Sequence, residues 1–279
     1  MNKFLLAIYT ILPKTIQHKL GQSVVLKPLR DFLLKNDGAY KEGEVFIDRQ
    51  YLDFKSQFKY MSTIKNAAKA KKSGVENTLL LNSFKLLKLH KDWRDEIIIF
   101  DVGANFGFLS LVWATTVCQK LGRVIAFEPN KNVYNSFKKS IDKNNLKNKI
   151  ELHNMAVGAE NKRISIFLNN TTSNVLESDK VLNKQEVEMI TLDNYFQKSH
   201  LKKCDLIKID VDGIELDILK GCTNVLKLYS PICIVETNSD NRIVSFFQSM
   251  DYDILDMDLK PFKEKNGLPP NIFCIPKIN

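Results

Sequence analysis

A glycine-containing turn, Asp101-Val-Gly-Ala-Asn-Phe-Gly107, is the segment of this sequence best suited to bind a ligand. It follows the apolar run 97–100 and precedes the apolar segment 108–117, so it joins a predicted buried strand to a predicted helix. Ligands of open α/β sheets bind where the carboxyl ends of strands meet helix N-termini, and glycine lets the backbone approach a ligand closely. The turn is therefore the first candidate for a ligand site.

The spacing of the turn argues against a dinucleotide. A G-x-G-x-x-G fingerprint that starts at Gly103 needs glycine at 105 and 108, where this chain has Asn105 and Phe108. An acidic residue two places before Gly103 suits a ligand with a cationic amino acid part, such as S-adenosylmethionine. Glu128 ends the predicted strand 123–128, where one carboxylate can accept hydrogen bonds from both ribose hydroxyls. Together these residues predict S-adenosylmethionine as the cofactor.

Two further acids, Asp210 and Asp212, follow the predicted strand 205–210. Methyl transfer to oxygen is an in-line displacement, and it needs a group that takes the proton of the hydroxyl. We expect Asp210 or Asp212 to be the catalytic base or to anchor the acceptor hydroxyl. In the structural alternative, Asp210 caps the next helix and Glu215 is a solvated first-turn acid. These acids could also hold Mg²⁺, but we do not favour a divalent metal.

Four motifs make the chain resemble the FkbM family of methyltransferases, over roughly residues 96–237. They are Asp101-Val-Gly-Ala-Asn-Phe-Gly107, Phe127-Glu-Pro129, Ile190-Thr-Leu-Asp193, and Ile207-Lys-Ile-Asp-Val-Asp-Gly213 followed by Glu215 and Leu219-Lys-Gly221. The resemblance implies a class I methyltransferase fold that methylates hydroxyl oxygens of sugars or small metabolites. One departure is Asp212, where the family usually has glutamate.

The resemblance also implies where parts of the cofactor lie. The turn residues Asp101, Gly103 and Asn105 would lie near its amino acid end, and Glu128 at its ribose. Met155 and Ala156 would lie beside its adenine. The full predicted cofactor-binding set is Asp101, Gly103, Ala104, Asn105, Phe106, Gly107, Glu128, Pro129, Asn130, Met155, Ala156 and Asp210.

The elements that position these residues follow from residue 96 onward, where short apolar runs alternate with amphipathic segments. This pattern is typical of β-α-β units and of a mainly parallel sheet. We predict a Rossmann-like class I methyltransferase domain at 92–279, with a seven-stranded sheet and helices on both faces. Its strands are expected at 97–101, 123–128, 150–154, 205–210 and 232–236, with antiparallel pairs at 163–168 with 187–191 and at 251–257 with 271–276.

Residues 1–91 are predicted to form a mostly helical, basic accessory region. They carry 17 Lys or Arg against 7 Asp or Glu, a net charge of +10, whereas the remainder carries 24 against 25. Such a region favours an anionic partner, although a solvated lysine-rich surface would have the same composition. Within it, residues 55–72 could line an anionic groove or form an amphipathic helix, and we favour the helix.

The apolar stretch 4–12 is too short to cross a bilayer, so we expect no transmembrane segment. An interfacial helix that contacts a membrane peripherally stays open, and the apolar N-terminal helices could also pair two subunits as a homodimer. The five cysteines occur singly in apolar runs without a C-x-x-C pair. They are predicted to be buried thiols in a reducing compartment, and the expected location is the cytoplasm.

The leading functional hypothesis is methyl transfer to a hydroxyl of a sugar, glycan or sugar-derived metabolite. A nucleotide- or phosphate-linked acceptor is one option, whose anionic part the basic residues 55–72 would attract. An RNA methyltransferase that uses the basic region is the first alternative. The strand end Ile209-Asp-Val-Asp-Gly213 argues against nucleic acid, because amino-methylating enzymes normally show Asn/Asp-Pro-Pro-Tyr/Phe there. A non-catalytic binding protein on the same fold is the second alternative.

Overall fold

A seven-stranded sheet forms the centre of the computed structural model, which describes residues 2–36, 39–92, 95–169, 172–174 and 183–277. The strand order is β14-β15-β13-β12-β5-β6-β7, and β15 is antiparallel to both of its neighbours while the other pairs are parallel. This is the predicted class I methyltransferase sheet. Its strands are β5 (Ile98–Val102), β6 (Arg123–Phe127), β7 (Ile150–His153), β12 (Leu206–Ile209), β13 (Ile232–Glu236), β14 (Tyr252–Leu255) and β15 (Asn271–Pro276).

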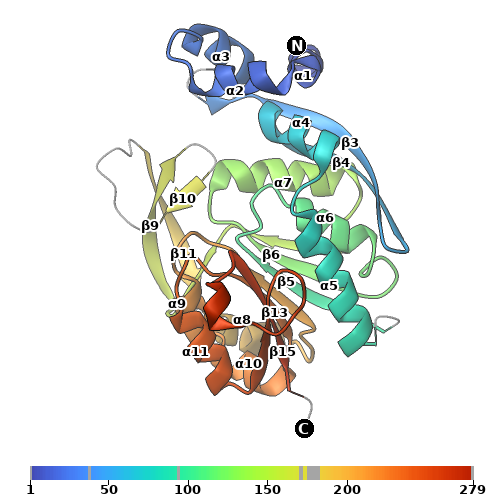
Figure 1. The fold of residues 1–279 in the computed structure, drawn as a ribbon, viewed down its shortest axis with the longest axis vertical. Coiled ribbons are helices and arrows are strands. Elements are labelled where there is room, and N and C mark those ends of the chain that lie inside the picture. The colour runs from blue at the N-terminus through green and yellow to red at the C-terminus, as the bar shows by residue number, and fades with distance from the viewer. Residues whose placement is uncertain (1, 37–38, 93–94, 170–171, 175–182, 278–279) are drawn as a thin grey trace.

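Helices cover both faces of this sheet (Figure 1). Successive strand residues point to opposite faces, so Ile99 packs in one apolar cluster and Phe100 in the other. The first cluster contains α5 (Asn77–His90), α6 (Phe108–Thr115) and α7 (Lys131–Lys143). The second contains α8 (Leu192–Ser199), α9 (Glu215–Lys220), α10 (Thr223–Tyr229) and α11 (Arg242–Ser249).

The strand order reverses beside β5, because β6 and β7 extend the sheet on one side and β12 and β13 on the other. The carboxyl ends of β5 and β12 therefore lie next to each other, with the helices that follow them on opposite faces. In open parallel sheets this position is where a ligand crevice forms. The fold thus brings the turn after Asp101 and the acids after Ile209 to one place.

A smaller sheet projects from the domain and contains the predicted antiparallel pair. It consists of β8 (Ala156–Val157), β9 (Lys162–Asn169), β10 (Thr172–Asn174) and β11 (Asn183–Ile190). Strands β9 and β11 pair antiparallel, as predicted, and β11 also pairs in parallel with β8. This pairing fixes Ala156 and the preceding Met155 beside the end of the large sheet.

The N-terminal region is mostly helical, as predicted, but it also contains a long hairpin. Its elements are α1 (Asn2–Ile11), α2 (Lys14–Gln22), α3 (Lys27–Leu34), β1 (Lys35–Asn36), β2 (Ala39–Tyr40), β3 (Glu42–Tyr51), β4 (Phe54–Thr63) and α4 (Ile64–Ser73). Strands β3 and β4 pair antiparallel over their whole length. The helix predicted for 55–72 is therefore wrong in its first half, because helix begins only at Ile64.

The physical reason for the error lies in the composition of the buried face of β4. Buried and exposed residues alternate along this strand, but two of the buried positions are Ser56 and Ser62, so the apolar alternation is incomplete. The Ser56 hydroxyl is satisfied by Thr115 of α6, at 2.8 Å between the two oxygens. A polar residue can be buried when its partner lies in another element, but the sequence alone does not identify such a residue as a core position.

The hairpin packs directly on the helices of the large sheet. Phe58 and Tyr60 both make edge-to-face contacts with Phe108 of α6, with ring centroids 5.5 and 5.3 Å apart. The backbone N–H of Met61 donates to Ser140 Oγ of α7 at 2.9 Å. One apolar cluster therefore runs from α1 to the sheet without a break at residue 91, and the domain boundary placed there stays a prediction.

Two other expectations are tested by the described residues. All five cysteines are buried free thiols, as predicted. No helix in the described ranges is long and apolar enough to cross a membrane.

Gly107, which precedes α6, provides a test of this packing. It has φ +75°, and a Cβ there would lie 2.1 Å from the Phe137 ring of α7. We expect Gly107→Ala to lower the free energy of unfolding by about 3 kcal/mol, through backbone strain and overpacking together. Urea denaturation would measure the change.

The matched control is a double-mutant cycle with Phe137→Leu, which removes the ring atoms nearest the added methyl group. The combined loss should fall short of the sum of the two single losses by about 1 kcal/mol or more, because the overpacking part of the Gly107→Ala loss disappears. Additive losses would contradict the tight contact between Gly107 and Phe137.

Candidate active site

A cavity of about 340 Å³ opens at the carboxyl ends of β5 and β12. Its volume lies within the range of small-molecule sites in proteins. The turn after β5 forms its floor, Glu128 and Pro129 follow from β6, and Asp210 and Asp212 follow from β12. The predicted crevice is therefore present.

Gly103 lets the two strand ends approach each other. Its φ is +75°, and a Cβ at this position would lie 1.9 Å from the backbone oxygen of Asp210. The N–H groups of Gly103 and Ala104 donate to the carbonyl of Phe127, at 3.1 and 3.0 Å. The turn is thus fixed against both neighbouring strands, and only glycine fits between them.

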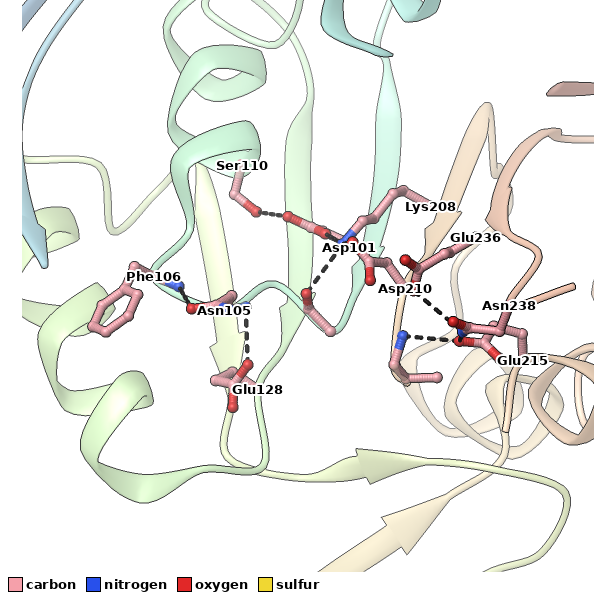
Figure 2. Close-up of polar contacts among 12 residues, drawn as sticks. Asp101, Asn105, Phe106, Ser110, Glu128, Lys208, Asp210, Glu215, Glu236 and Asn238 are labelled. Carbon is pink, nitrogen blue, oxygen red and sulfur yellow. Dashed lines mark hydrogen bonds and ion pairs between the residues drawn. The ribbon is translucent and has the colours of Figure 1, made fainter. Parts of the chain in front are cut away.

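The buried ammonium group of Lys208 lies at the centre of the site (Figure 2). Lys208 Nζ lies 3.5 Å from Asp101 Oδ1 and 3.3 Å from Asp210 Oδ2, and it donates to the carbonyl of Gly103 at 3.1 Å. Burial alone would lower the pKa of Lys208, but Asp210 and Asp101 outweigh this effect and raise the pKa above its ordinary value. Lys208 therefore stays charged and balances the two carboxylates.

One carboxylate oxygen of Asp101 accepts a hydrogen bond within the protein, and the other does not. The hydroxyl of Ser110 donates to Asp101 Oδ2, whereas Oδ1 is buried and accepts no hydrogen bond from the described residues, although it is ion-paired with Lys208. Because Asp101 lines the cavity, this oxygen suits a positively charged donor of a ligand. The amino group of S-adenosylmethionine is such a donor, so the residue fits that cofactor.

Glu128 is buried and held by two backbone groups. Oε2 accepts from the N–H of Asn105 at 2.9 Å, and Oε1 accepts from the N–H of Asn130 at 2.8 Å. Burial raises the pKa of Glu128 to about 7, although both hydrogen bonds act in the opposite direction. Each carboxylate oxygen keeps acceptor capacity for a further donor, which fits the expected ribose hydroxyls.

Asp210 and Glu236 form a pair with unequal proton affinities. Lys208 lowers the pKa of Asp210, and a hydrogen bond from Glu236 adds to this effect. Burial and the neighbouring Asp210 charge raise the pKa of Glu236 to about 7. Below about pH 7, Glu236 therefore retains its proton and donates it to the ionised Asp210, and Figure 2 shows the two side chains together.

Asp212 lies on a loop that Glu215 organises. The buried Glu215 carboxylate accepts from the N–H of Gly213 at 3.1 Å and from Asn238 Nδ2 at 2.7 Å. Asp212 itself is exposed at the cavity mouth with φ +60°, and desolvation followed by the charge of Asp210 raises its pKa. The structural alternative is wrong at both points, since Glu215 is not solvated and α9 has no side-chain cap from Asp210.

Most of the predicted site residues come together at the cavity, while contact with the cofactor itself stays a prediction. Gly107 and Asn130 do not line it. Gly107 is packed at the start of α6, and the Asn130 side chain caps α7 by accepting from the N–H groups of Asn132 and Val133. The predicted residues that line the cavity are Asp101, Gly103, Ala104, Asn105, Phe106, Glu128, Pro129, Met155, Ala156, Asp210 and Asp212.

Several cavity residues lie outside the predicted cofactor-binding and catalytic set. Tyr60, Asn66, Lys69 and Glu76 reach the cavity from the N-terminal region, which was predicted to be an accessory region. The first three belong to the basic segment 55–72, for which an anionic groove was the alternative prediction. Lys208 did have a signal, because it is a charged residue within the otherwise apolar strand β12.

The described residues hold no group of three or more His, Cys, Asp or Glu side chains arranged to bind a metal ion. His153 lies at the sheet edge, where it stacks on Phe127 with ring centroids 5.1 Å apart and shares hydrogen bonds with Glu151 and Tyr195. His153 is therefore a packing residue whose ring nitrogen is satisfied by hydrogen bonds.

Comparison with known families agrees with this geometry. A family model described as the methyltransferase FkbM domain matches residues 101–256, more than half of the chain. The chain belongs to this family. The resemblance expected from the motifs is thereby confirmed, and with it S-adenosylmethionine as the cofactor of the family's fold.

Two curated proteins are similar to this FkbM methyltransferase. The hexuronic acid methyltransferase AglP of Haloferax volcanii is 23% identical over 139 residues, which are 50% of this chain and 55% of that protein. Methyltransferase 1 of Beauveria bassiana is 22% identical over 149 residues, 46% of this chain and 59% of that protein. The matched part thus spans little more than half the length of either relative.

A solved structure is also similar, that of methyltransferase FkbM from Methylobacillus flagellatus KT. It is 16% identical with a TM-score of 0.45, and the match covers 64% of this chain and 43% of that one. The human METTL16 N-terminal domain in complex with SAH is 14% identical with a TM-score of 0.39, over 72% of this chain and 70% of that one.

Replacing Lys208 should be costly, because two neighbouring carboxylates would lose their cation. We expect Lys208→Met to lower the free energy of unfolding by about 3 kcal/mol or more, as found when one partner of a buried ion pair is removed. Lys220→Met is the matched control, since Lys220 pairs with Asp217 at 3.0 Å on the exposed face of α9. Equal losses in urea denaturation would contradict a central role for Lys208.

The pKa of Glu128 gives a prediction for pH. The folded protein holds this proton up to about pH 7, whereas the unfolded chain releases it near 4.5, so the contribution of Glu128 to stability falls as the pH rises through this window. Cofactor binding should respond in the opposite direction, because the ionised carboxylate is the better acceptor for hydroxyl groups. Below pH 7, the affinity for S-adenosylhomocysteine should fall by about tenfold per pH unit.

Isothermal titration calorimetry of the wild-type protein and Glu128→Gln at several pH values would measure this effect. The variant keeps Glu236, which has a similar pKa, so it isolates the contribution of Glu128. An unchanged pH profile in Glu128→Gln would rule out the assigned ribose contact.

Proposed function

We propose that this FkbM methyltransferase transfers a methyl group from S-adenosylmethionine to a hydroxyl of a sugar, glycan or sugar-derived acceptor. The observation that carries the proposal is the set of acids at the end of β12, where Asp212 lies at the open mouth of the cavity beside the ionised Asp210. When bound, the cofactor supplies an electrophilic methyl group. What this chain must add is alignment of the acceptor and removal of one proton.

Asp212 is the better base of the two acids. Lys208 lowers the pKa of Asp210 and so weakens its basicity, whereas desolvation raises the pKa of Asp212. The acceptor oxygen gains the methyl group while the proton of its hydroxyl passes to Asp212. Asp210 is the ionised hydrogen-bond acceptor that orients this hydroxyl, and Glu236 beside Asp210 keeps its own proton below about pH 7.

The wall of the cavity formed by α4 suits a polar, anionic acceptor. Asn66 offers an amide donor and acceptor to sugar hydroxyls, and Lys69 brings a positive charge to the same wall. A uronic acid combines hydroxyls with a carboxylate, and the relative in Haloferax volcanii is a hexuronic acid methyltransferase.

Removing the base should slow the chemical step more than it weakens binding. We expect Asp212→Asn to lower kcat by about 100-fold or more, the usual contribution of general base catalysis, with little change in KM. The measurement is release of S-adenosylhomocysteine with oligosaccharides that contain uronic acids, and mass spectrometry would locate the added methyl group on oxygen.

Asp217→Asn is the control, because Asp217 lies on the exposed side of α9 and pairs with Lys220. It should keep full activity. Methylation of RNA in place of the oligosaccharides would refute the proposed acceptor class, and full activity of Asp212→Asn would refute the assigned base.

A further inference from the structure

The first three helices form a cap, residues 2–34, at one end of the molecule beyond the β3-β4 hairpin and α4 (Figure 1). Large apolar side chains are exposed there at unusual density. Of the 12 such side chains in the described part of the chain, seven belong to this cap: Phe4, Ile11, Ile16, Val24, Val25, Leu29 and Phe32. Exposed apolar residues gathered in this way usually mark an interaction surface.

Helix α1 is apolar on two sides. Leu5, Leu6 and Tyr9 are buried against the rest of the protein, whereas Phe4 and Ile11 are 70% and 82% exposed. The outward residues are spaced by about two helical turns, so they lie on one face. A helix with an apolar inner face and an apolar outer face needs a second apolar environment beyond the core it already covers.

Helix α3 repeats this arrangement. Leu33 and Leu34 are buried, whereas Leu29 and Phe32, one turn apart, are exposed. The exposed Phe32 ring lies 5.2 Å from the ammonium group of Lys41. A cation therefore stands directly beside the outward apolar face of α3.

Charge distinguishes the partners that could cover the cap. Residues 2–36 contain six Lys or Arg and one acid, Asp31. Lys19 and Lys27 are exposed beside the apolar side chains of α2 and α3. A second copy of the cap would bring the same positive charge against itself, which is unfavourable, whereas an anionic surface would be attracted.

We propose that the cap binds to the surface of an anionic lipid bilayer. The outward side chains of α1 and α3 enter the boundary between headgroups and acyl chains, and the lysines contact the headgroup phosphates. Helix α1 has ten residues and is about 15 Å long, half the thickness of the hydrocarbon core, so it lies in the interface. This inference does not depend on the proposed methyl transfer.

Vesicle co-sedimentation of the full chain tests the proposal. The chain should bind vesicles that mix phosphatidylglycerol with phosphatidylcholine, and it should bind vesicles of phosphatidylcholine alone much less. The double variant Phe4→Ser with Ile11→Ser should bind roughly tenfold more weakly, because two buried apolar side chains are lost. The double variant Lys19→Glu with Lys27→Glu should also bind these vesicles more weakly. Added salt should weaken vesicle binding by the wild-type protein.

The matched control exchanges the same residue types outside the cap, in the variant Leu228→Ser with Lys227→Glu. Leu228 is 74% exposed on α10 and Lys227 is exposed beside it. This variant should bind like the wild-type protein, and unchanged S-adenosylhomocysteine binding would show that all variants fold. Absent vesicle binding, or equal binding by cap and control variants, would overturn the proposal. So would a solution dimer that the Phe4→Ser with Ile11→Ser variant abolishes, since the occupant would then be a second copy.

Discussion

The site depends on charge balance around the buried ammonium group of Lys208. Parallel strands end at the same edge of a sheet, and in the register of β5 and β12 Lys208 is the direct neighbour of Asp101. This geometry brings Asp101 and Asp210 close together in a poorly solvated place, where two carboxylates destabilise each other. A cation between them lets both stay ionised. The close approach of the strands also explains the glycine at 103, because any side chain there would collide with the backbone of Asp210.

The same balance gives neighbouring acids different properties. Asp210 is in contact with Lys208 and is the more acidic group, whereas Glu236 is farther from that cation and keeps its proton to about pH 7. Asp212 lies two residues beyond Asp210 but faces the cavity mouth, because Glu215 holds the loop between them. Differences in environment of this kind allow one fold to place an ionised anchor and a more basic acid side by side.

The large sheet could be read from the sequence because its strands are continuous apolar runs, and the turn because its glycines and acids are close together in the chain. The hairpin was missed because β4 buries Ser56 and Ser62, and the partner of the Ser56 hydroxyl lies on α6, far away in the sequence. Two residues were predicted to bind the cofactor only because they are close in sequence to the site, and they do not line the cavity. Gly107 and Asn130 adjoin cavity residues, but backbone direction turns them toward the packing of α6 and α7.

The cavity residues from α4 and its surroundings lie outside the segment 101–256 that defines the family in this chain. The two walls of this pocket therefore come from different parts of the sequence, and the structural requirements on their residues differ. The wall that includes Asp101 and Glu128 is tied to the sheet and its strand register. The wall that includes Asn66 and Lys69 is carried by a helix after a hairpin, and its side chains can change without altering that register. A comparison between proteins of the family's common segment alone therefore leaves one wall of the pocket, with its shape and charge, undescribed.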